Sequence, residues 1–247
     1  MRFSSLLVLA AVFEELSFLL QQTNHLVPQT ISGRPLWQGK LSHCPFWILQ
    51  GGPGVVNSAQ ALTAAIETLH PQLVIQIGCG GGFKKSRIEI GDIAIATEEH
   101  DVQTGIESEH ERYPLHSLPF PLIQQPNQEN LITHYPFNQS LISQCFSIIT
   151  QNSPASNVLK GPFITVSTIT ARDHTADTLF NYYQAIIESM EGSSAAHVCM
   201  HYGIPFIEIR SASNFVGKRT RSDWNIPLAS ENVSKAAIKI IKNVLVS

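Results

Sequence analysis

Short apolar runs alternate along the chain with longer segments whose apolar residues recur at helical spacing. The apolar runs predict buried strands at residues 4–11, 45–49, 73–77, 92–96, 163–167 and 204–210. The periodic segments predict helices at residues 14–22, 55–69, 140–150, 180–202 and 234–246. Strands that alternate with helices favour the α/β class, with a mixed central sheet flanked by helices. No internal repeat or linker divides the chain, so we expect one domain over residues 1–247.

Two glycine-rich segments, Gly51–Gly54 and Gly78–Gly82, follow predicted strands. We interpret both as loops that end a strand and let the backbone approach a ligand closely. Neither has the glycine spacing of a dinucleotide-binding turn, and neither continues into the Gly-Lys-Ser/Thr of a phosphate-binding loop. Residues 114–138 are rich in proline, glutamine and asparagine, which predicts a long excursion outside the core.

Composition narrows the possible partners. Hydrophobic residues make up 43% and charged residues 14% of the chain, which is typical of a globular protein with a full core. The net charge of −3 gives no bulk attraction to nucleic acid or to an anionic membrane. The ten histidines lack zinc-site spacing and the four cysteines form no Cys-x-x-Cys pair, so we expect no metal and reduced thiols in the cytoplasm.

The first residues leave two interpretations open. Arg2 and the apolar run of residues 6–13 resemble the start of a secretory signal peptide, but Glu14 and Glu15 interrupt the run and no cleavage pattern follows. The alternative, which we prefer, is a buried first strand followed by a helix. No stretch is long and apolar enough to predict a membrane span.

A carboxylate and an amide mark the most informative part of the sequence. Glu191 enters a run of very small residues after Met190, and Asn214 stands at the end of the predicted strand 204–210. Open α/β sheets bind ligands at the carboxyl ends of their strands. A cleft with one carboxylate and one amide at its edges suits a polyhydroxylated, nitrogen-rich ligand such as a nucleoside.

These residues, with several other segments, resemble the nucleosidase branch of the nucleoside phosphorylase superfamily. The nearest members are futalosine hydrolase and methylthioadenosine/S-adenosylhomocysteine nucleosidase. The resemblance covers nearly the whole chain and is carried by residues 13–16, 51–54, 78–82, 91–93, 189–192 and 210–214. Residues 219–224, Arg-Thr-Arg-Ser-Asp-Trp, are more similar to the futalosine branch.

The resemblance implies a role for each matching residue. Glu15 corresponds to the carboxylate that activates the hydrolytic water, although an acidic pair in the first turn of a helix also suits the helix dipole. Glu191 corresponds to the residue that binds the ribose hydroxyls, and Met190 to one packed against the ribose. The other residues that the resemblance places at the substrate are Gly81, Cys79, Thr168 and Ile169. Cys79 stands where the family often has serine, and we expect a small packing residue rather than a nucleophile.

Asn214 departs from the methylthioadenosine nucleosidases, which have an aspartate at this position. An amide offers both a donor and an acceptor. It can therefore donate to a 6-oxo group and accept from a protonated N7, whereas an ionised aspartate would face the 6-oxo oxygen acceptor to acceptor. Asn214 favours a 6-oxopurine such as the hypoxanthine of futalosine.

Water is the expected nucleophile. Phosphorylases of one related group have an arginine at the position of Gln76, and without a cationic clamp phosphate binding is poorly supported; Arg34 and Arg87 remain candidates. We predict a cofactor-free futalosine hydrolase of menaquinone biosynthesis, a homodimer as the resemblance implies. The alternatives are a nucleosidase for methylthioadenosine, S-adenosylhomocysteine or aminofutalosine, and a non-catalytic nucleoside-binding protein of the same fold.

Overall fold

Strand β5 (Val74–Gly82) organises the molecule, because it pairs with three other strands. Its first half lies between β1 (Leu6–Ala10) and β10 (Phe206–Phe215), and its last residues pair with β9 (Ile187–Ser189). In this computed structural model the described residues are 1–247 except 110–111, 125–130, 152–156, 219–223 and 246–247.

The mixed sheet has two parts. On one side of β5 the order is β1, β4 (Cys44–Gln50), β3 (Arg34–Leu41) and β2 (Val27–Ile31). On the other side β9 continues into β8 (Val158–Thr165), β6 (Ile93–Asp101) and β10. Since β10 also pairs with β5, these five strands close into a ring, and the short β7 (His134–Pro136) is attached to β6. The predicted single α/β domain with a mixed sheet is confirmed.

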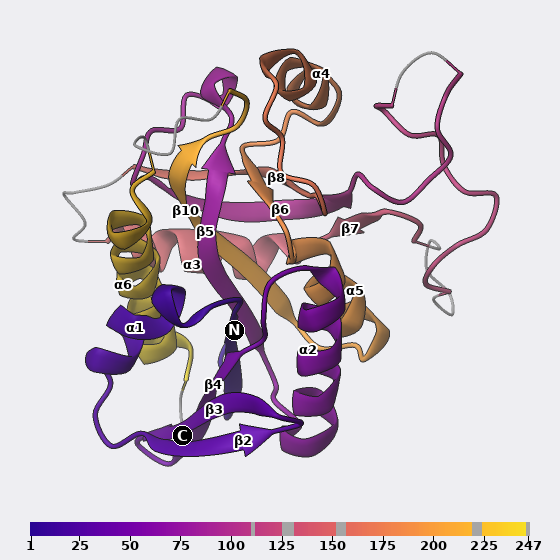
Figure 1. The fold of residues 1–247 in the computed structure, drawn as a ribbon. Coiled ribbons are helices and arrows are strands. Elements are labelled where there is room, and N and C mark those ends of the chain that lie inside the picture. Colours follow the sequence, from indigo (N-terminus) through magenta and orange to yellow (C-terminus); the bar gives the residue numbers. More distant parts are fainter. Residues whose placement is uncertain (110–111, 125–130, 152–156, 219–223, 246–247) are drawn as a thin grey trace.

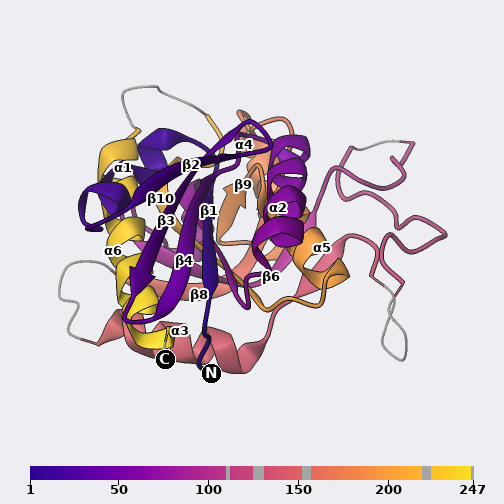
Figure 2. The same ribbon diagram turned by 90° about the horizontal axis from the view of Figure 1, so that it is seen from below.

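Helices cover the sheet on both sides. Helices α1 (Phe13–Gln21) and α6 (Ile226–Val244) pack together on one side, and α2 (Val55–Leu69) and α5 (Gly192–His201) on the other, as both views show (Figure 1 and Figure 2). Helix α3 (Gln139–Thr150) packs against α6, β6 and β8, and α4 (Asp173–Tyr183) follows β8. A single turn of 3-10 helix, Lys84–Ser86, follows β5.

The central strand β1 is buried at all five positions, which is how a strand covered by helices on both faces is built. The apolar run at the start of the chain therefore forms this strand. The predicted excursion protrudes from the body between β6 and β7 (Figure 1), although Ile123, Leu131 and Tyr135 return to the core. Among the described residues, no helix has both the length and the apolar character needed to cross a membrane.

Two expectations were wrong, and one hairpin was not predicted. The single helix predicted over residues 180–202 is instead the end of α4, the strand β9 and the helix α5. The backbone of Ile187–Ser189 adopts the extended form because it pairs with both β5 and β8, which overrides local helical preference. The predicted loop Gly78–Gly82 lies within β5, since β10 pairs with it throughout. The hairpin of β2 and β3 was missed because four of the five residues of β2 are exposed and show no apolar alternation.

Candidate active site

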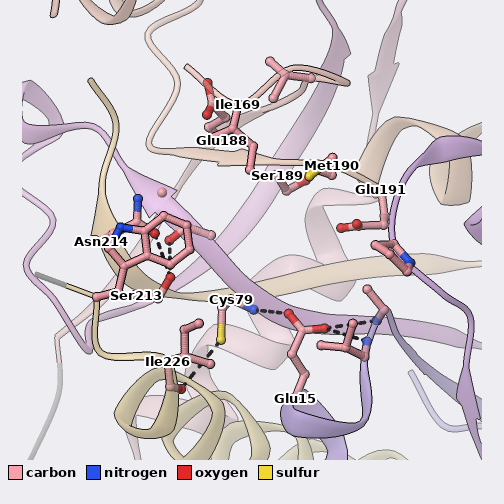
Figure 3. A pocket seen from close by; sticks show the side chains of 17 residues that line it. Glu15, Cys79, Ile169, Glu188, Ser189, Met190, Glu191, Ser213, Asn214 and Ile226 are labelled. Carbon is pink, nitrogen blue, oxygen red and sulfur yellow. Dashed lines mark hydrogen bonds between the residues drawn. The ribbon is translucent and has the colours of Figure 1, made fainter. Parts of the chain in front are cut away.

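A cavity of about 320 Å³ lies where β1, β5 and β10 reach their carboxyl ends, beside the start of α5 (Figure 3). Its walls are mostly apolar, with a few polar groups that converge on the space, which is the usual composition of a small-molecule site. The residues that line it are Ala11, Val12, Glu15, Pro53, Cys79, Gly80, Gly81, Val166, Ile169, Glu188, Ser189, Met190, Glu191, Ser213, Asn214, Trp224 and Ile226.

Glu15 stands in the first turn of α1, just beyond β1, and its side chain turns back onto that junction. Its Oε1 accepts a hydrogen bond from the Cys79 N–H at 2.7 Å, and its Oε2 accepts from the N–H groups of Ala11 and Val12 at 3.0 and 3.3 Å. The residue is only 6% exposed. Burial and the nearby Glu191 carboxylate raise the pKa of Glu15, while the Arg210 guanidinium and the backbone donors oppose that shift.

Gly78 makes room for this arrangement. A Cβ added to Gly78 would lie 2.6 Å from both Oε1 of Glu15 and Nη1 of Arg210. The carboxylate and the guanidinium therefore share the space that a side chain at position 78 would fill. Any larger residue there should displace Glu15, and this close approach explains the first glycine of the run.

Glu191 lies at the N-cap of α5, where β9 turns into the helix. Its Oε1 accepts a hydrogen bond from the Gly54 N–H at 3.0 Å, and its Oε2 accepts from Nη2 of Arg210 at 3.3 Å. The glycine-rich turn after β4 therefore contacts the site through Gly54, which lies at the start of α2. Glu191 is 5% exposed and borders the cavity on the same side as Glu15 (Figure 3).

Asn214 occupies the opposite side of the cavity (Figure 3). Its Nδ2 donates to the Phe215 carbonyl at 3.1 Å, and its Oδ1 accepts from the Ser213 hydroxyl at 2.9 Å. A carbonyl can only accept, so the NH₂ group must be the one that faces Phe215. Among the described residues, these two bonds leave one N–H and one oxygen lone pair of Asn214 for a ligand.

The sheet register places three residues of this side in one row. Gly81 of β5 pairs with Asn214 of β10 on one edge and with Glu188 of β9 on the other. Because Gly81 has no side chain, the row has a gap between an amide and a carboxylate. All three residues line the cavity.

Most of the predicted site residues come together. Glu15, Asn214, Met190, Glu191, Gly81, Cys79 and Ile169 all line the cavity. Thr168 is exposed and is not among the lining residues, while the half-buried Ile169 is, so the role expected for Thr168 stays a prediction. The chain turns between these two residues after β8, so only the second faces inward.

Cys79 fits a packing role better than a nucleophilic one. Its thiol lies 3.4 Å from the Ser230 hydroxyl of α6. Burial and the neighbouring Glu15 carboxylate raise the pKa of Cys79 to about 12, so the thiol stays protonated. None of the four cysteines is in a disulfide.

Several residues at the cavity were not predicted from the sequence. Arg210 was noted only as part of a motif, yet it is the buried cation beneath the cavity at 1% exposure. The signal for it was present, because Glu208 and Arg210 interrupt an otherwise apolar strand at alternate positions. Glu188, Ser189 and Ser213 also line the cavity, and Ile226 reaches it from the start of α6. Residues 219–223, most of the segment that resembled the futalosine branch, lie outside the described residues, whereas Trp224 lines the cavity.

Neither arginine that remained a phosphate candidate lines the cavity. Arg34 donates to Asn57 at 2.7 Å, and Arg87 is exposed after the 3-10 turn. Gln76 is buried within β5. Arg210 contacts the lining residues Cys79 and Glu191, and its three nitrogen groups already bind carboxylates and a carbonyl.

One group of residues elsewhere has metal-ligating side chains. Nε2 of His100 and Nε2 of His134 lie 3.2 and 2.8 Å from the two oxygens of Glu98, and the three ligand atoms lie within 4.8 Å of one another. Histidine spacing missed this group because His134 stands on β7, across from His100 of β6. None of the three lines the cavity.

The model of the Phosphorylase superfamily matches residues 5–245. The chain belongs to this superfamily. A 5'-methylthioadenosine/S-adenosylhomocysteine nucleosidase of an Exiguobacterium species is 28% identical over 96% of this chain and 97% of its own length. The two solved structures compared below share the fold.

The nucleosidase of Neisseria meningitidis, in complex with methylthio-immucillin-A, has a TM-score of 0.81 at 18% identity and covers 97% of this chain and 99% of its own. Futalosine hydrolase of Helicobacter pylori has a TM-score of 0.83 at 17% identity, with 96% and 97% covered. The predicted nucleosidase branch is therefore confirmed, and the relatives are N-glycosidic hydrolases. They include both the methylthioadenosine type and futalosine hydrolase, so the choice of substrate rests on the cavity itself.

Proposed function

We propose that this protein is a purine nucleosidase that hydrolyses futalosine and releases hypoxanthine. The nucleosidase part is supported by the superfamily and by the two carboxylates, Glu15 and Glu191, that border one cavity. The choice of futalosine is supported first by the amide of Asn214 on the other side.

In the proposed mechanism, Glu15 accepts a proton from water as the water attacks the anomeric carbon of the ribose. The raised pKa of Glu15, caused first by burial, makes it a stronger base than an ordinary glutamate. Glu191 accepts hydrogen bonds from the ribose hydroxyls and holds the sugar while positive charge develops on it. The bond to the purine breaks, and the electron pair leaves with the base, which is then stabilised by hydrogen bonds.

The base side supports a 6-oxopurine. The remaining N–H of Asn214 donates to a 6-oxo group. As the bond to the ribose breaks, N7 of the departing base takes a proton from solvent, and the remaining lone pair of the Asn214 oxygen accepts a hydrogen bond from this N7–H. An aspartate at this position would turn an oxygen toward the Phe215 carbonyl, which repels it. The local backbone therefore suits an amide.

Glu188 adds to this preference. It stands across Gly81 from Asn214, and its Oε1 accepts a hydrogen bond from the Thr170 N–H at 3.0 Å. A 6-oxopurine has a hydrogen on N1, whereas a 6-aminopurine has a lone pair there. A carboxylate on the base side favours the first pattern and disfavours the second.

A second candidate is cleavage of 5'-methylthioadenosine or S-adenosylhomocysteine. The observation that favours it is the identity of the relatives in sequence, which are named as nucleosidases for these two substrates. Aminofutalosine, a 6-amino compound, belongs to the same alternative. These substrates release adenine, so the released base distinguishes the two candidates directly.

The test is to incubate the purified protein separately with futalosine, aminofutalosine and 5'-methylthioadenosine, with and without phosphate. We expect hypoxanthine from futalosine, a free reducing sugar in both conditions, and slower release of adenine from the other two. Preferential release of adenine would move the protein to the second candidate. A sugar phosphate that forms only with phosphate would overturn hydrolysis, and no cleavage by a folded protein would leave a nucleoside-binding protein.

The resemblance also implies a homodimer in the cytoplasm. Sedimentation of the purified chain should therefore give twice the mass of 27.2 kDa. A monomer that retains full activity would contradict this part of the proposal.

A further inference from the structure

Arg210 is a buried cation with more than one carboxylate around it. Its Nε donates to Oε1 of Glu208 at 2.8 Å, and its Nη2 donates to Oε2 of Glu191 at 3.3 Å. Glu15 also interacts with its charge. A single positive charge therefore faces Glu15, Glu191 and Glu208, in a place where water cannot screen them.

A fourth carboxyl group, Glu99 of β6, meets Glu208 beneath the start of α5. A Cβ added to Gly192 would lie 2.4 Å from Oε2 of Glu208 and 2.6 Å from Oε1 of Glu99. The two groups thus border the same small space, which Gly192 leaves open. Both residues are 0% exposed. Two full negative charges in this position would repel each other strongly.

The surroundings of the two groups differ. Glu208 binds Arg210 directly, whereas Glu99 accepts a hydrogen bond from the Thr165 hydroxyl, a neutral donor. Oε2 of Glu99 and Oε2 of Glu208 are both buried, and neither has a hydrogen-bond partner among the described residues. Two bare carboxylate oxygens in such a place are costly, whereas one proton turns either oxygen into a donor, and the Arg210 contact favours the negative charge on Glu208.

Burial raises the pKa of both carboxyl groups, but Arg210 opposes this shift more strongly at Glu208 than at Glu99. Burial and the Glu208 carboxylate raise the pKa of Glu99 well above its usual range, and Asp101 on the same strand adds to this. The Thr165 hydroxyl of β8 and Arg210 of β10 oppose the shift. Glu98 and His100 flank Glu99 on β6 and bind each other on the other face of the strand. Tyr135 of β7 stays neutral because burial and the nearby acids raise its pKa.

Two series of hydrogen bonds connect Glu99 and Glu208 to the ribose side of the cavity. Glu208 binds Arg210, and Arg210 binds the Glu191 side chain. Glu99 binds Thr165, whose Oγ1 accepts a hydrogen bond from the Ser193 N–H at 2.8 Å. Ser193 follows Glu191 by two residues in the first turn of α5. The first series of contacts therefore holds the side chain of Glu191, and the second holds the backbone of Ser193, two residues after it.

We infer that Glu99 holds a proton and Glu208 a negative charge, and that this pair positions Glu191 for the ribose. The inference rests on the proposed nucleosidase function. The pair does not touch the substrate, and its proton stays between the two carboxyl groups throughout the reaction. Glu99 and Glu208 are thus positioning residues that act through Thr165 and Arg210.

Two isosteric substitutions test this assignment, because glutamine imitates a protonated carboxyl group and not a charged one. We expect Glu99→Gln to keep kcat/KM within about threefold of the wild type near neutral pH. Glu208→Gln should lower kcat/KM by about 10- to 100-fold, since Arg210 loses its partner and Glu191 moves. Glu99→Ala should also lose activity, and Glu98→Gln, one residue away on the other face of β6, is the control. Equal losses in the two glutamine variants, or the reverse order, would overturn the assignment.

The pH profile separates positioning from a merely structural role. As pH rises through the raised pKa of Glu99, the wild type should lose activity because the Glu99 proton dissociates. The Glu99→Gln protein has no dissociable proton at position 99, so the loss of activity at alkaline pH should disappear from its pH–activity profile. An identical alkaline limb in both proteins contradicts the inference. Cys79 does not interfere, because its pKa is raised to about 12.

Thermal unfolding provides a readout that needs no substrate. A carboxyl group whose pKa is raised in the folded state contributes stability at low pH, and this contribution is lost as pH rises through the folded pKa. The Tm of Glu99→Gln minus that of the wild type should therefore grow as pH rises. A flat difference, or a Glu99→Gln protein that does not fold, refutes the inference. If the wild type cleaves no nucleoside, the proposed function fails while this measurement still tests the shared proton.

Discussion

On one side of the cavity, Glu15 and Glu191 are ionisable groups held by backbone N–H groups and by Arg210, from segments far apart in the chain. On the other side, Asn214 is a neutral amide held by its own neighbours, Ser213 and Phe215. A change on the charged side leaves a buried partner without its counter-charge, which is costly. A change at Asn214 disturbs only local contacts. The ribose side should therefore set the reaction, and the base side should set the choice of purine.

The largest expected effect comes from removing the charge of Glu15. Glu15→Gln should lower kcat by about 10²- to 10⁴-fold with little change in ligand binding, because the amide cannot accept the proton from water. Single-turnover rates and the binding of an unreactive nucleoside would separate the two quantities. Glu14→Gln is the matched control, since Glu14 is exposed and lies next to Glu15. Near-normal turnover of Glu15→Gln would remove this residue from the mechanism.

The next effect concerns the ribose. If Glu191 accepts hydrogen bonds from the ribose hydroxyls, a 2'-deoxy substrate should have kcat/KM lower by about 10- to 100-fold, the value of a lost charge-assisted hydrogen bond. Glu191→Gln should reduce the difference between the two sugars. Equal kcat/KM for the ribo and deoxyribo substrates in the wild type would sink the assignment.

A smaller effect is expected on the base side, where a substitution should change the preference between purine substrates more than the overall rate of cleavage. Asn214→Asp should shift the ratio of kcat/KM away from futalosine and toward aminofutalosine by about tenfold or more, since a donor becomes an acceptor opposite the purine edge. The discrimination between ribose and deoxyribose should stay the same in this variant. A ratio that does not move would show that Asn214 does not contact the purine.

The smallest effect is a shift in pH dependence. The general base must be ionised, so activity should fall as pH falls through the pKa of Glu15, which burial and the Glu191 carboxylate raise above the ordinary glutamate value of about 4.3. Removing the like charge with Glu191→Gln should move this acid limb to lower pH. Asn214→Ala, on the neutral side, should lower the rate without moving the limb. If Glu191→Gln and Asn214→Ala shifted the acid limb of the pH–activity profile equally, the proposed difference between the ribose side and the base side would be contradicted.

The sequence predicted the elements whose pattern is local. The helix 55–69 agrees residue for residue with α2, and the apolar run near the start of the chain forms β1. Prediction from the sequence was wrong where the pairing between strands decides the local structure. The backbone of residues 187–189 is extended because strands on both sides require it, and Gly78–Gly82 stays in β5 for the same reason.

The same division holds for the site. The sequence by itself determined the chemical groups, Glu15, Glu191 and Asn214, because residue type and order along the chain carry that information. Only the tertiary structure decided that Arg210 lies beneath both carboxylates, that Ile169 rather than Thr168 faces the cavity, and that Glu99 meets Glu208 at Gly192. These contacts join different strands and helices, and the energy of a buried charge depends on its neighbours in space and not on its neighbours in sequence.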